Sequence, residues 1–175
     1  MFRKIKKVFF VFYRGMIKQI DGFSPRLYMK MYNGYLKKIG VVLEGTPRYI
    51  HPSVKFDGKG YNKTFLGHDV VISRETLLLN HDYSIACGFR SIGENVEREA
   101  FWLKEIRIGD NTFVGANVSI LPGTVIGTNC IIGTGSVIKG RIPDGSVVLG
   151  NPAKIVGRTQ EWIMKKKEVN DFFFE

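Results

Sequence analysis

The chain has 175 residues, of which 44% are hydrophobic and 24% are charged, so it can bury a core and is not intrinsically disordered. Its two cysteines give neither a disulfide framework nor a metal cluster, which indicates a reducing, cytoplasmic compartment. The longest charge-free apolar stretch near the N-terminus, residues 8–13, is far shorter than the ~20 residues of a membrane-spanning helix, and no secretory cleavage site follows it.

Nearly all of the net charge of +10 belongs to the first 40 residues. Residues 1–40 carry ten Lys/Arg and one acidic residue, whereas residues 41–175 carry sixteen Lys/Arg and fifteen acidic residues. Because the second part is almost neutral, we do not expect it to bind nucleic acid. The chain therefore divides into a basic arm, residues 1–40, and a body.

The basic arm is predicted to form two helices. In residues 1–20 apolar residues recur every three or four positions, which predicts one apolar helix face surrounded by Lys and Arg. A second helix begins after the N-cap residue Ser24, with Pro25 in its first turn, and ends at Gly40. The apolar faces comprise Phe2, Ile5, Phe9, Phe12, Met16 and Ile20 in the first helix and Leu27, Met31, Tyr35 and Leu36 in the second.

Two interpretations of the first helix stay open. A basic amphipathic helix can bind an anionic membrane surface, which would place the protein at the inner face of the membrane through residues 1–20. Alternatively, its apolar face packs on the body or on a neighbouring subunit, as most amphipathic helices do.

The body repeats with a period of six residues, which neither a helix nor an alternating strand explains. Such a repeat predicts short strands joined by tight turns and stacked coil on coil, with three hexapeptides in each coil. An aliphatic residue of each repeat fills the interior, and a small residue four positions later fits beside it. The aliphatic positions are Leu66, Ile72, Leu78, Ile108, Val114, Ile120, Ile126, Ile132 and Ile138; the small ones are Val70, Thr76, Thr112, Val118, Thr124, Cys130 and Ser136.

Glycine and two irregular segments complete the pattern. Glycine follows several aliphatic residues, at Gly109, Gly115, Gly127 and Gly133 for example, where we expect it to supply turn conformations closed to other residues. Residues 84–105 carry no hexapeptide, and a loop of this length is usually functional, although a contact with another subunit is the alternative. The body thus spans residues 41–158, and residues 159–175 are predicted to form a C-terminal helix.

Three stretches resemble the hexapeptide-repeat acyltransferases: NHDYS at 80–84, IGDNTFVGANVSILPGTVIGTNCIIGTGSVI at 108–138 and IPDGSVVLGNPAKIVGR at 142–158. The resemblance covers about residues 48–158 and is greatest to sugar and polysaccharide O-acetyltransferases of the maltose and galactoside acetyltransferase type. It implies an all-β, left-handed parallel β-helix, a homotrimer with active sites between subunits, and acetyl-CoA as acyl donor.

Within this resemblance, His81 of NHDYS matches the family's catalytic histidine, a general base that removes the proton of the acceptor hydroxyl. Its neighbours Asn80 and Asp82 are candidates for orienting the imidazole or binding the acceptor. Asp82 falls in the small inward position of the repeat, but adjacent side chains of a strand point in opposite directions. The acidic residues of the loop, Glu94, Glu97 and Glu99, are further candidates for orienting His81.

The resemblance also implies where acetyl-CoA binds. Ala116 and Thr134 match positions whose backbone holds the pantetheine arm, and Phe113 stands where many relatives have tryptophan. Lys154 and Arg158 match basic residues near the CoA phosphates.

No metal is expected in this chain. A γ-type carbonic anhydrase has the same fold, but its zinc needs three histidines, some at close spacing, and His51, His68 and His81 are widely spaced. We expect His68 to be a surface residue and His51 a structural one.

The sequence thus predicts an acetyl-CoA-dependent O-acetyltransferase that transfers directly to a sugar or polysaccharide hydroxyl. Cys130 occupies an inward position and Cys87 matches no family motif, so no acetyl-cysteine intermediate is expected. Two alternatives stay open: a different acceptor, such as an amino sugar, serine or an antibiotic, or a non-catalytic β-helix that serves in assembly.

Overall fold

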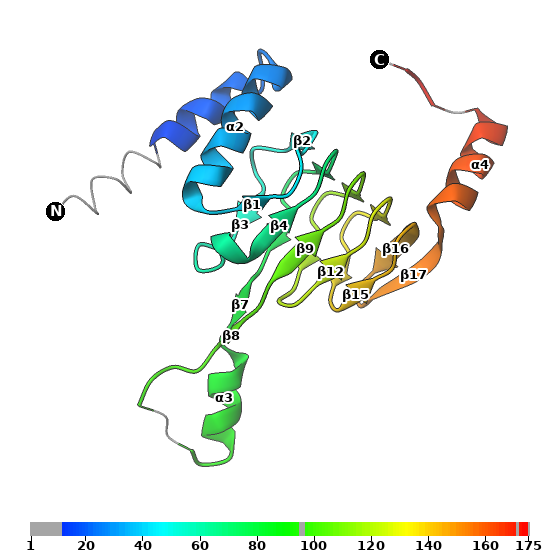
Figure 1. Cartoon of the computed structure of the whole chain (residues 1–175). Coiled ribbons are helices and arrows are strands. Elements are labelled where there is room, and N and C mark those ends of the chain that lie inside the picture. The colour runs from blue at the N-terminus through cyan, green and yellow to red at the C-terminus, as the bar shows by residue number, and fades with distance from the viewer. Residues whose placement is uncertain (1–11, 95–96, 171, 175) are drawn as a thin grey trace.

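Strands of mostly two or three residues stack into three parallel sheets that form the sides of a prism (Figure 1). This computed structural model describes residues 12–94, 97–170 and 172–174. Sheet A contains β1 (Val42–Leu43), β4 (Thr64–Leu66), β9 (Ile106–Ile108), β12 (Val125–Ile126) and β15 (Arg141–Ile142). Sheet B contains β2 (Tyr49–Ile50), β5 (Val71–Ile72), β10 (Phe113–Val114), β13 (Ile131–Ile132) and β16 (Ser146–Gly150), and sheet C contains β3 (Lys55–Phe56), β6 (Leu77–Leu78), β11 (Ser119–Ile120) and β14 (Val137–Ile138).

Each coil runs through sheets A, B and C in turn, so the prism has an A–B, a B–C and a C–A edge where the chain changes sheet. Neighbouring coils pair in parallel register; Val114, for example, lies between Ile72 and Ile132. At the C-terminal end β17 (Ala153–Arg158) pairs antiparallel with β16 and closes sheet B.

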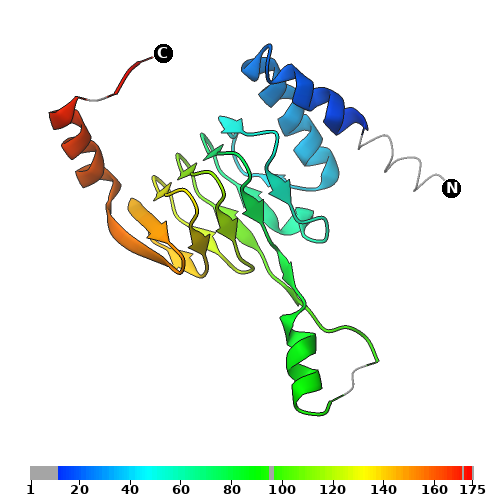
Figure 2. The same ribbon diagram turned by 180° about the vertical axis from the view of Figure 1, so that it is seen from behind.

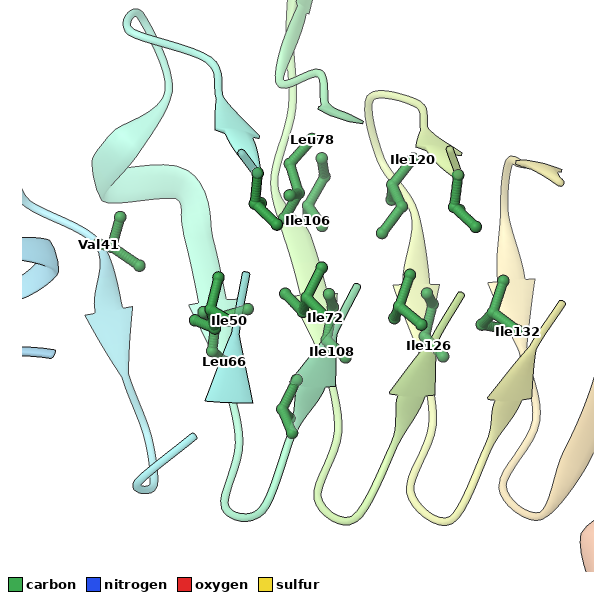
Figure 3. Packing of buried hydrophobic residues seen from close by; sticks show 14 of the residues in the cluster. Val41, Ile50, Leu66, Ile72, Leu78, Ile106, Ile108, Ile120, Ile126 and Ile132 are labelled. Atoms are coloured by element: carbon green, nitrogen blue, oxygen red, sulfur yellow. The ribbon is translucent and has the colours of Figure 1, made fainter. Parts of the chain in front are cut away.

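The interior is built from the predicted hexapeptide positions. Every predicted aliphatic residue of the repeat is at most 2% exposed, and these side chains stack along the prism axis (Figure 3). The small residues are equally buried, and their hydroxyl groups donate to backbone carbonyls at the corners: Thr76 Oγ1 to Gly115 O at 3.0 Å and Ser136 Oγ to Gly133 O at 2.7 Å. The corners thereby satisfy buried polar groups that would otherwise destabilise the fold.

The repeat glycines were predicted to supply turn conformations closed to other residues, and this prediction was wrong. Gly109 and Gly115 do not have positive φ; a Cβ at Gly115 would instead lie 2.7 Å from the backbone nitrogen of Thr134 in the next coil. The left-handed turn conformations belong to later residues of each corner, such as Asn111 (φ 49°) and Asn117 (φ 56°). Glycine is thus required for the close approach of successive coils, and asparagine tolerates the left-handed turn.

The basic arm covers the first coil. Residues 12–20 are helical, and α2 (Pro25–Ile39) begins at the N-cap Ser24, whose side chain accepts from Leu27 N, and ends at Gly40 with φ 107°. Tyr28 anchors α2 because its hydroxyl donates to Ile50 O at 2.7 Å.

The apolar faces predicted for the arm are partly wrong. In α2 the buried residues are Tyr28, Met29, Tyr32, Tyr35 and Leu36, whereas the predicted Leu27 is 48% exposed. In the first helix Ile17 is buried and the predicted Ile20 packs partly buried against the core, whereas Phe12 and Met16 are exposed. The remaining predicted positions, Phe2, Ile5 and Phe9, lie outside the described residues. The arm therefore packs through one set of apolar side chains and presents another set to solvent.

The segment 84–105 is not a loop alone. It stands on a stalk of two antiparallel strands, β7 (His81–Asp82) and β8 (Trp102–Leu103), and contains helix α3 (Ser84–Ser91) (Figure 2). The helix was missed because an eight-residue helix inside a charged segment has too short an apolar period to be recognised.

A 3-10 helix, η1 (Tyr61–Lys63), and helix α4 (Thr159–Val169) complete the chain. Helix α4 ends at Asn170 in the left-handed conformation, so the predicted C-terminal helix is shorter than residues 159–175. Among the described residues no helix is both long and apolar enough to cross a membrane.

Replacing an inward residue should destabilise the stack far more than replacing its outward neighbour. For Ile132→Ala, which empties a fully buried position of β13, we expect a loss of about 2–5 kcal/mol in the free energy of unfolding. The matched control is Ile131→Ala on the same strand, with a loss less than half as large. Equal losses in urea denaturation would contradict the inward assignment.

Candidate active site

His81 lies where the chain leaves sheet C and enters the stalk. Its side chain is 25% exposed, and its Nδ1 is hydrogen-bonded to Oδ2 of Asp57, which also accepts the backbone N–H of His81 at 2.9 Å. No hydrogen bond to Nε2 is present within the described part of the chain. One ring nitrogen is therefore held by a carboxylate, and the other is left for a ligand.

Asp57 is the residue that orients His81, and it comes from the turn after β3, one coil before the histidine. Its side chain is only 3% exposed. Burial raises the pKa of Asp57, but hydrogen bonds from the His81 side chain and from the backbone N–H groups of Lys59 and His81 together lower that pKa below its ordinary value. Asp57 is thus an ionised carboxylate at neutral pH.

The charge of Asp57 fixes the tautomer of His81. An ionised carboxylate only accepts hydrogen bonds, so Nδ1 of His81 must carry the proton that joins the two side chains. The neutral imidazole then has its lone pair on Nε2, which is the arrangement of a general base.

Two aromatic rings enclose the imidazole. The rings of Tyr83 and Phe101 meet the His81 ring edge-on, with centroid distances of 5.4 and 6.4 Å. Lys59, from the same turn as Asp57, places its Nζ over both aromatic rings, at 4.5 and 4.6 Å from their centroids, and contacts the Tyr83 hydroxyl. One turn therefore holds the histidine through a carboxylate and its aromatic neighbours through a cation.

Asn80 does not orient the imidazole. It is fully buried, its Nδ2 donates to the carbonyls of Lys63 and Lys104 at 3.1 Å, and its Oδ1 accepts from Thr64 Oγ1 at 2.9 Å. Because Lys104 follows the stalk, these bonds tie the start of the excursion to its end. Asn80 is an anchor of the stalk.

Asp82 is exposed, not inward, because the coil ends before it. Its carboxylate accepts the backbone N–H of Ser84 at 2.7 Å, and hydrogen bonds from Ser84 lower the pKa of Asp82. It borders a cavity of about 180 Å³ that is also lined by Trp102, Lys104 and Lys139. Asp82 therefore has no bond to the His81 ring but lies where an acceptor could bind beside the stalk.

The acidic residues of the loop do not reach His81 either. Glu99 pairs with Arg90 at 3.2 Å, and both side chains are exposed. Glu94 and Glu97 are exposed and make no bond to the histidine.

The predicted acetyl-CoA residues gather along sheet B and its B–C edge. Phe113 on β10 is 43% exposed, and Ala116 and Thr134 lie on adjacent coils at the B–C edge, where Gly135 N donates to Ala116 O at 2.9 Å. Lys154 pairs with Leu149 near the same edge, whereas Arg158 pairs with Ser146 at the other end of β17, near the A–B edge.

Within one chain, His81 and these residues lie apart. Ala116 and Thr134 follow sheet B, at the B–C edge, whereas His81 follows sheet C, at the C–A edge. The width of sheet C separates the two edges. The structure therefore groups Phe113, Ala116, Thr134 and Lys154 with one another but not with the predicted base, and it sets Arg158 apart from them.

The remaining histidines and cysteines take no part in this site. Nδ1 of His51 bonds Ser53, and His68 is exposed beside Asp69, in agreement with the expected roles. Cys130 is buried, which raises the pKa of its thiol, and Cys87 is exposed on α3. No group of three or more His, Cys, Asp or Glu side chains that could hold a metal occurs among the described residues.

Part of the β-helix matches a known protein family. Residues 105–140 match the family described as bacterial transferase hexapeptide (six repeats). A solved galactoside acetyltransferase in complex with coenzyme A superposes with a TM-score of 0.60 at 20% identity, covering 93% of this chain and 84% of that one, which shows a common fold. The prism is the left-handed β-helix that the sequence predicted.

Two curated relatives carry acetyltransferase names. The chain is 28% identical to "Putative acetyltransferase YvoF" of Bacillus subtilis over 91% of its own length and 81% of the relative's. It is 32% identical to "Putative lipopolysaccharide biosynthesis O-acetyl transferase WbbJ" of Escherichia coli over 52% of its own length. The matches span only 48% of that protein and 36% of another relative. Residues 105–140 thus carry a hexapeptide-repeat match, and the chain is similar to proteins named acetyltransferases.

His81 was among the site residues predicted from the sequence, whereas Asp57 was not. The first coil departs from the six-residue period, so the position of Asp57 beside the histidine could not be read from the repeat. The available signal was the Asp-Gly turn of FDGKG, because β3 pairs with β6 and so brings this turn next to NHDYS.

The Asp57–His81 pair should make stability depend on pH. Because the pKa of Asp57 is lower in the folded protein than its ordinary value of 3.8, its contribution is present above that value and is lost as the pH falls through the lower folded value. We expect Asp57→Asn to lower the free energy of unfolding by about 1–3 kcal/mol at neutral pH. On acidification below about pH 4, the variant should lose less of this free energy than the wild type.

Urea denaturation across that pH range measures both effects. Glu161→Gln, at an exposed position of α4, is the control and should follow the wild type. An Asp57→Asn profile parallel to that of the wild type would contradict the assignment.

Proposed function

We propose that the protein is an acetyl-CoA-dependent O-acetyltransferase that acts on a sugar or polysaccharide hydroxyl, with His81 as general base. The observation that carries this proposal is the hydrogen bond between Nδ1 of His81 and the ionised carboxylate of Asp57, which leaves Nε2 to accept a proton. The relationship to proteins named acetyltransferases supports the reaction class.

The reaction is a direct transfer. Nε2 of His81 removes the proton of the acceptor hydroxyl as its oxygen attacks the thioester carbonyl of acetyl-CoA. The tetrahedral intermediate collapses with cleavage of the C–S bond, and the CoA thiolate takes the proton back from the imidazolium. Asp57 stabilises the imidazolium during this cycle without itself being protonated.

The donor would lie along sheet B and the B–C edge. Gly135, where a Cβ would meet no atom within 4 Å, leaves room for the pantetheine arm beside the backbone of Ala116 and Thr134, and Phe113 offers an exposed aromatic surface. Lys154, which is exposed near the same edge, would meet a CoA phosphate. Arg158 lies at the opposite end of β17 and would reach a different part of the donor.

A carbohydrate acceptor would bind at the stalk. The cavity lined by Asp82, Trp102 and Lys104 offers an exposed indole for the apolar face of a sugar and charged groups for its hydroxyls. The O-acetyl transferase name of one relative favours a polysaccharide hydroxyl over serine, an amino sugar or an antibiotic.

The active site would be completed in a homotrimer. In one chain the base and the donor groove lie at different edges of sheet C. The base of one subunit therefore needs the donor groove of another subunit. A threefold arrangement can bring the C–A edge of one subunit against the B–C edge of the next. Each trimer would then contain three sites, each between two subunits. We further propose that this trimer works in the cytoplasm, at the inner face of the membrane.

Loss of the base should abolish transfer but not folding. We expect His81→Ala to lower kcat about 10²–10⁴-fold, measured as release of free CoA thiol in the presence of a carbohydrate acceptor, with an unchanged circular dichroism spectrum. His68→Ala, at an exposed histidine, is the matched control and should retain activity. A wild-type protein that releases no thiol with any acceptor would favour the non-catalytic assembly module.

The shared site can be tested by mixing two inactive subunits. Thr134→Trp should block the donor groove at an exposed position, and His81→Ala removes the base. Alone, each variant should be inactive, but co-expressed subunits should recover activity because some interfaces of mixed trimers combine an intact base with an intact groove. Mixtures that stay inactive, although light scattering shows mixed trimers, would place the site within one subunit.

A further inference from the structure

The helical hairpin, residues 12–39, presents large apolar side chains to solvent. Phe23 in its turn is 92% exposed and Phe12 is 76% exposed; Met16 and Leu27 are about half exposed at 55% and 48%. These side chains are distinct from Ile17, Tyr28 and Tyr32, which pack on the body. Exposed apolar groups gathered in one short segment are typical of a surface that meets a partner or a membrane.

The same hairpin is strongly basic. It carries six Lys/Arg and one acidic residue, Asp21, and that acid accepts a hydrogen bond from Tyr49 on the body at 2.9 Å. Because Asp21 is engaged inward, the outer surface of the hairpin has no carboxylate to offset its cations. A surface of this kind is complementary to anionic lipid headgroups.

A cavity of about 680 Å³ lies between α2 and the A–B edge of the first two coils. Arg26 and Lys30 line it from the helix, and Arg48, His68 and Asp69 line it from the turns. Arg48 is paired with Asp69 at 3.3 Å, whereas Arg26 and Lys30 form no ion pair with a described residue. Two cations in a single cavity are thus available for an anion.

We propose that this hairpin docks the protein on an anionic bilayer. Phe12, Met16, Phe23 and Leu27 enter the interfacial region, and the cavity receives the phosphate of a lipid headgroup between Arg26 and Lys30. Charge and exposed apolar surface act together here, as they do in amphipathic membrane anchors.

A lipid is favoured over a neighbouring subunit because of where the surface lies. The proposed subunit contacts are at the two edges that flank sheet C, whereas the cavity is at the A–B edge, opposite sheet C. The hairpin also covers the free end of the first coil (Figures 1 and 2). Both positions stay outward in a trimer built around sheet C.

Docking would place the candidate active site close to the membrane. His81 leaves the second coil, and coils are spaced by about 4.8 Å, so it lies only one coil from the coil that the hairpin covers. Resting on the proposed function, this geometry points to an acceptor glycan carried on a membrane lipid. Membrane binding itself does not depend on acetyl transfer.

The test is co-sedimentation of the full-length protein with vesicles. We expect binding to vesicles of phosphatidylcholine with phosphatidylglycerol, little binding to phosphatidylcholine alone, and release at high salt. The triple variant Phe23→Ser, Arg26→Gln and Lys30→Gln should bind at least ten times more weakly. It should still transfer acetyl groups to soluble acceptors.

The matched control changes the same chemistry at the other end of the molecule. Phe173 is 96% exposed, and Lys165 and Lys167 are exposed on α4, so the triple variant Phe173→Ser, Lys165→Gln and Lys167→Gln should bind like the wild type. If both variants lose vesicle binding equally, binding depends on non-specific charge and the proposal is overturned.

Three other results would also overturn it: no binding by the wild type, loss of the trimer in the hairpin variant by light scattering, or tight binding of soluble glycerol phosphate without vesicles. Loss of the trimer would show that the hairpin is a subunit contact. Tight binding of glycerol phosphate would show that the cavity is a site for free phosphates. If acetyl transfer is absent but vesicle binding follows the hairpin, the proposed function fails and the docking surface stands.

Discussion

The close stacking of successive coils is the constraint on which the rest of this structure depends. Each strand donates and accepts hydrogen bonds to the strands one coil before and after it, so adjacent coils must keep the same length and register. This explains why the six-residue repeat is kept from one regular coil to the next. It also explains why Gly115 cannot carry a Cβ, because the backbone of Thr134 occupies that space.

The candidate site arises where this regularity ends. The third side of the second coil does not continue into the next coil; instead, Asn80 ties the two ends of the stalk together and His81 projects from its base. The preceding coil supplies Asp57 and Lys59 from one turn, so the imidazole is oriented by a residue 24 positions earlier in the chain. The rigid stack thus holds a histidine and a carboxylate that no local segment could keep in place.

The two ends of the prism are covered by different elements. At the N-terminal end, the helical hairpin buries Ile17, Tyr28 and Leu36 over the first coil. At the C-terminal end, the antiparallel strand β17 pairs with the last strand of sheet B, and α4 follows it. Both devices protect strand edges that would otherwise be free to pair with other chains. The hairpin is the larger of the two and retains apolar and basic surface beyond what the cap requires.

The sequence by itself determined the coil, because a six-residue period specifies which side chains of each repeat point inward and which point outward. It therefore predicted the buried residues from Leu66 to Ile138, the caps at Ser24 and Gly40, and the position of His81 at the end of the repeat. These are local properties: a period, a capping residue and a motif each lie within a few residues of one another.

Only the tertiary structure decided which residues meet across coils. Asp57, not Asp82 or a loop glutamate, reaches the imidazole because β3 lies beside β6, and that pairing carries no signal in an irregular first coil. The exposed position of Leu27 and the placement of Arg158 away from Lys154 were decided in the same way, by packing between elements. A period fixes the direction of a side chain, but contacts between distant segments depend on how those segments stack.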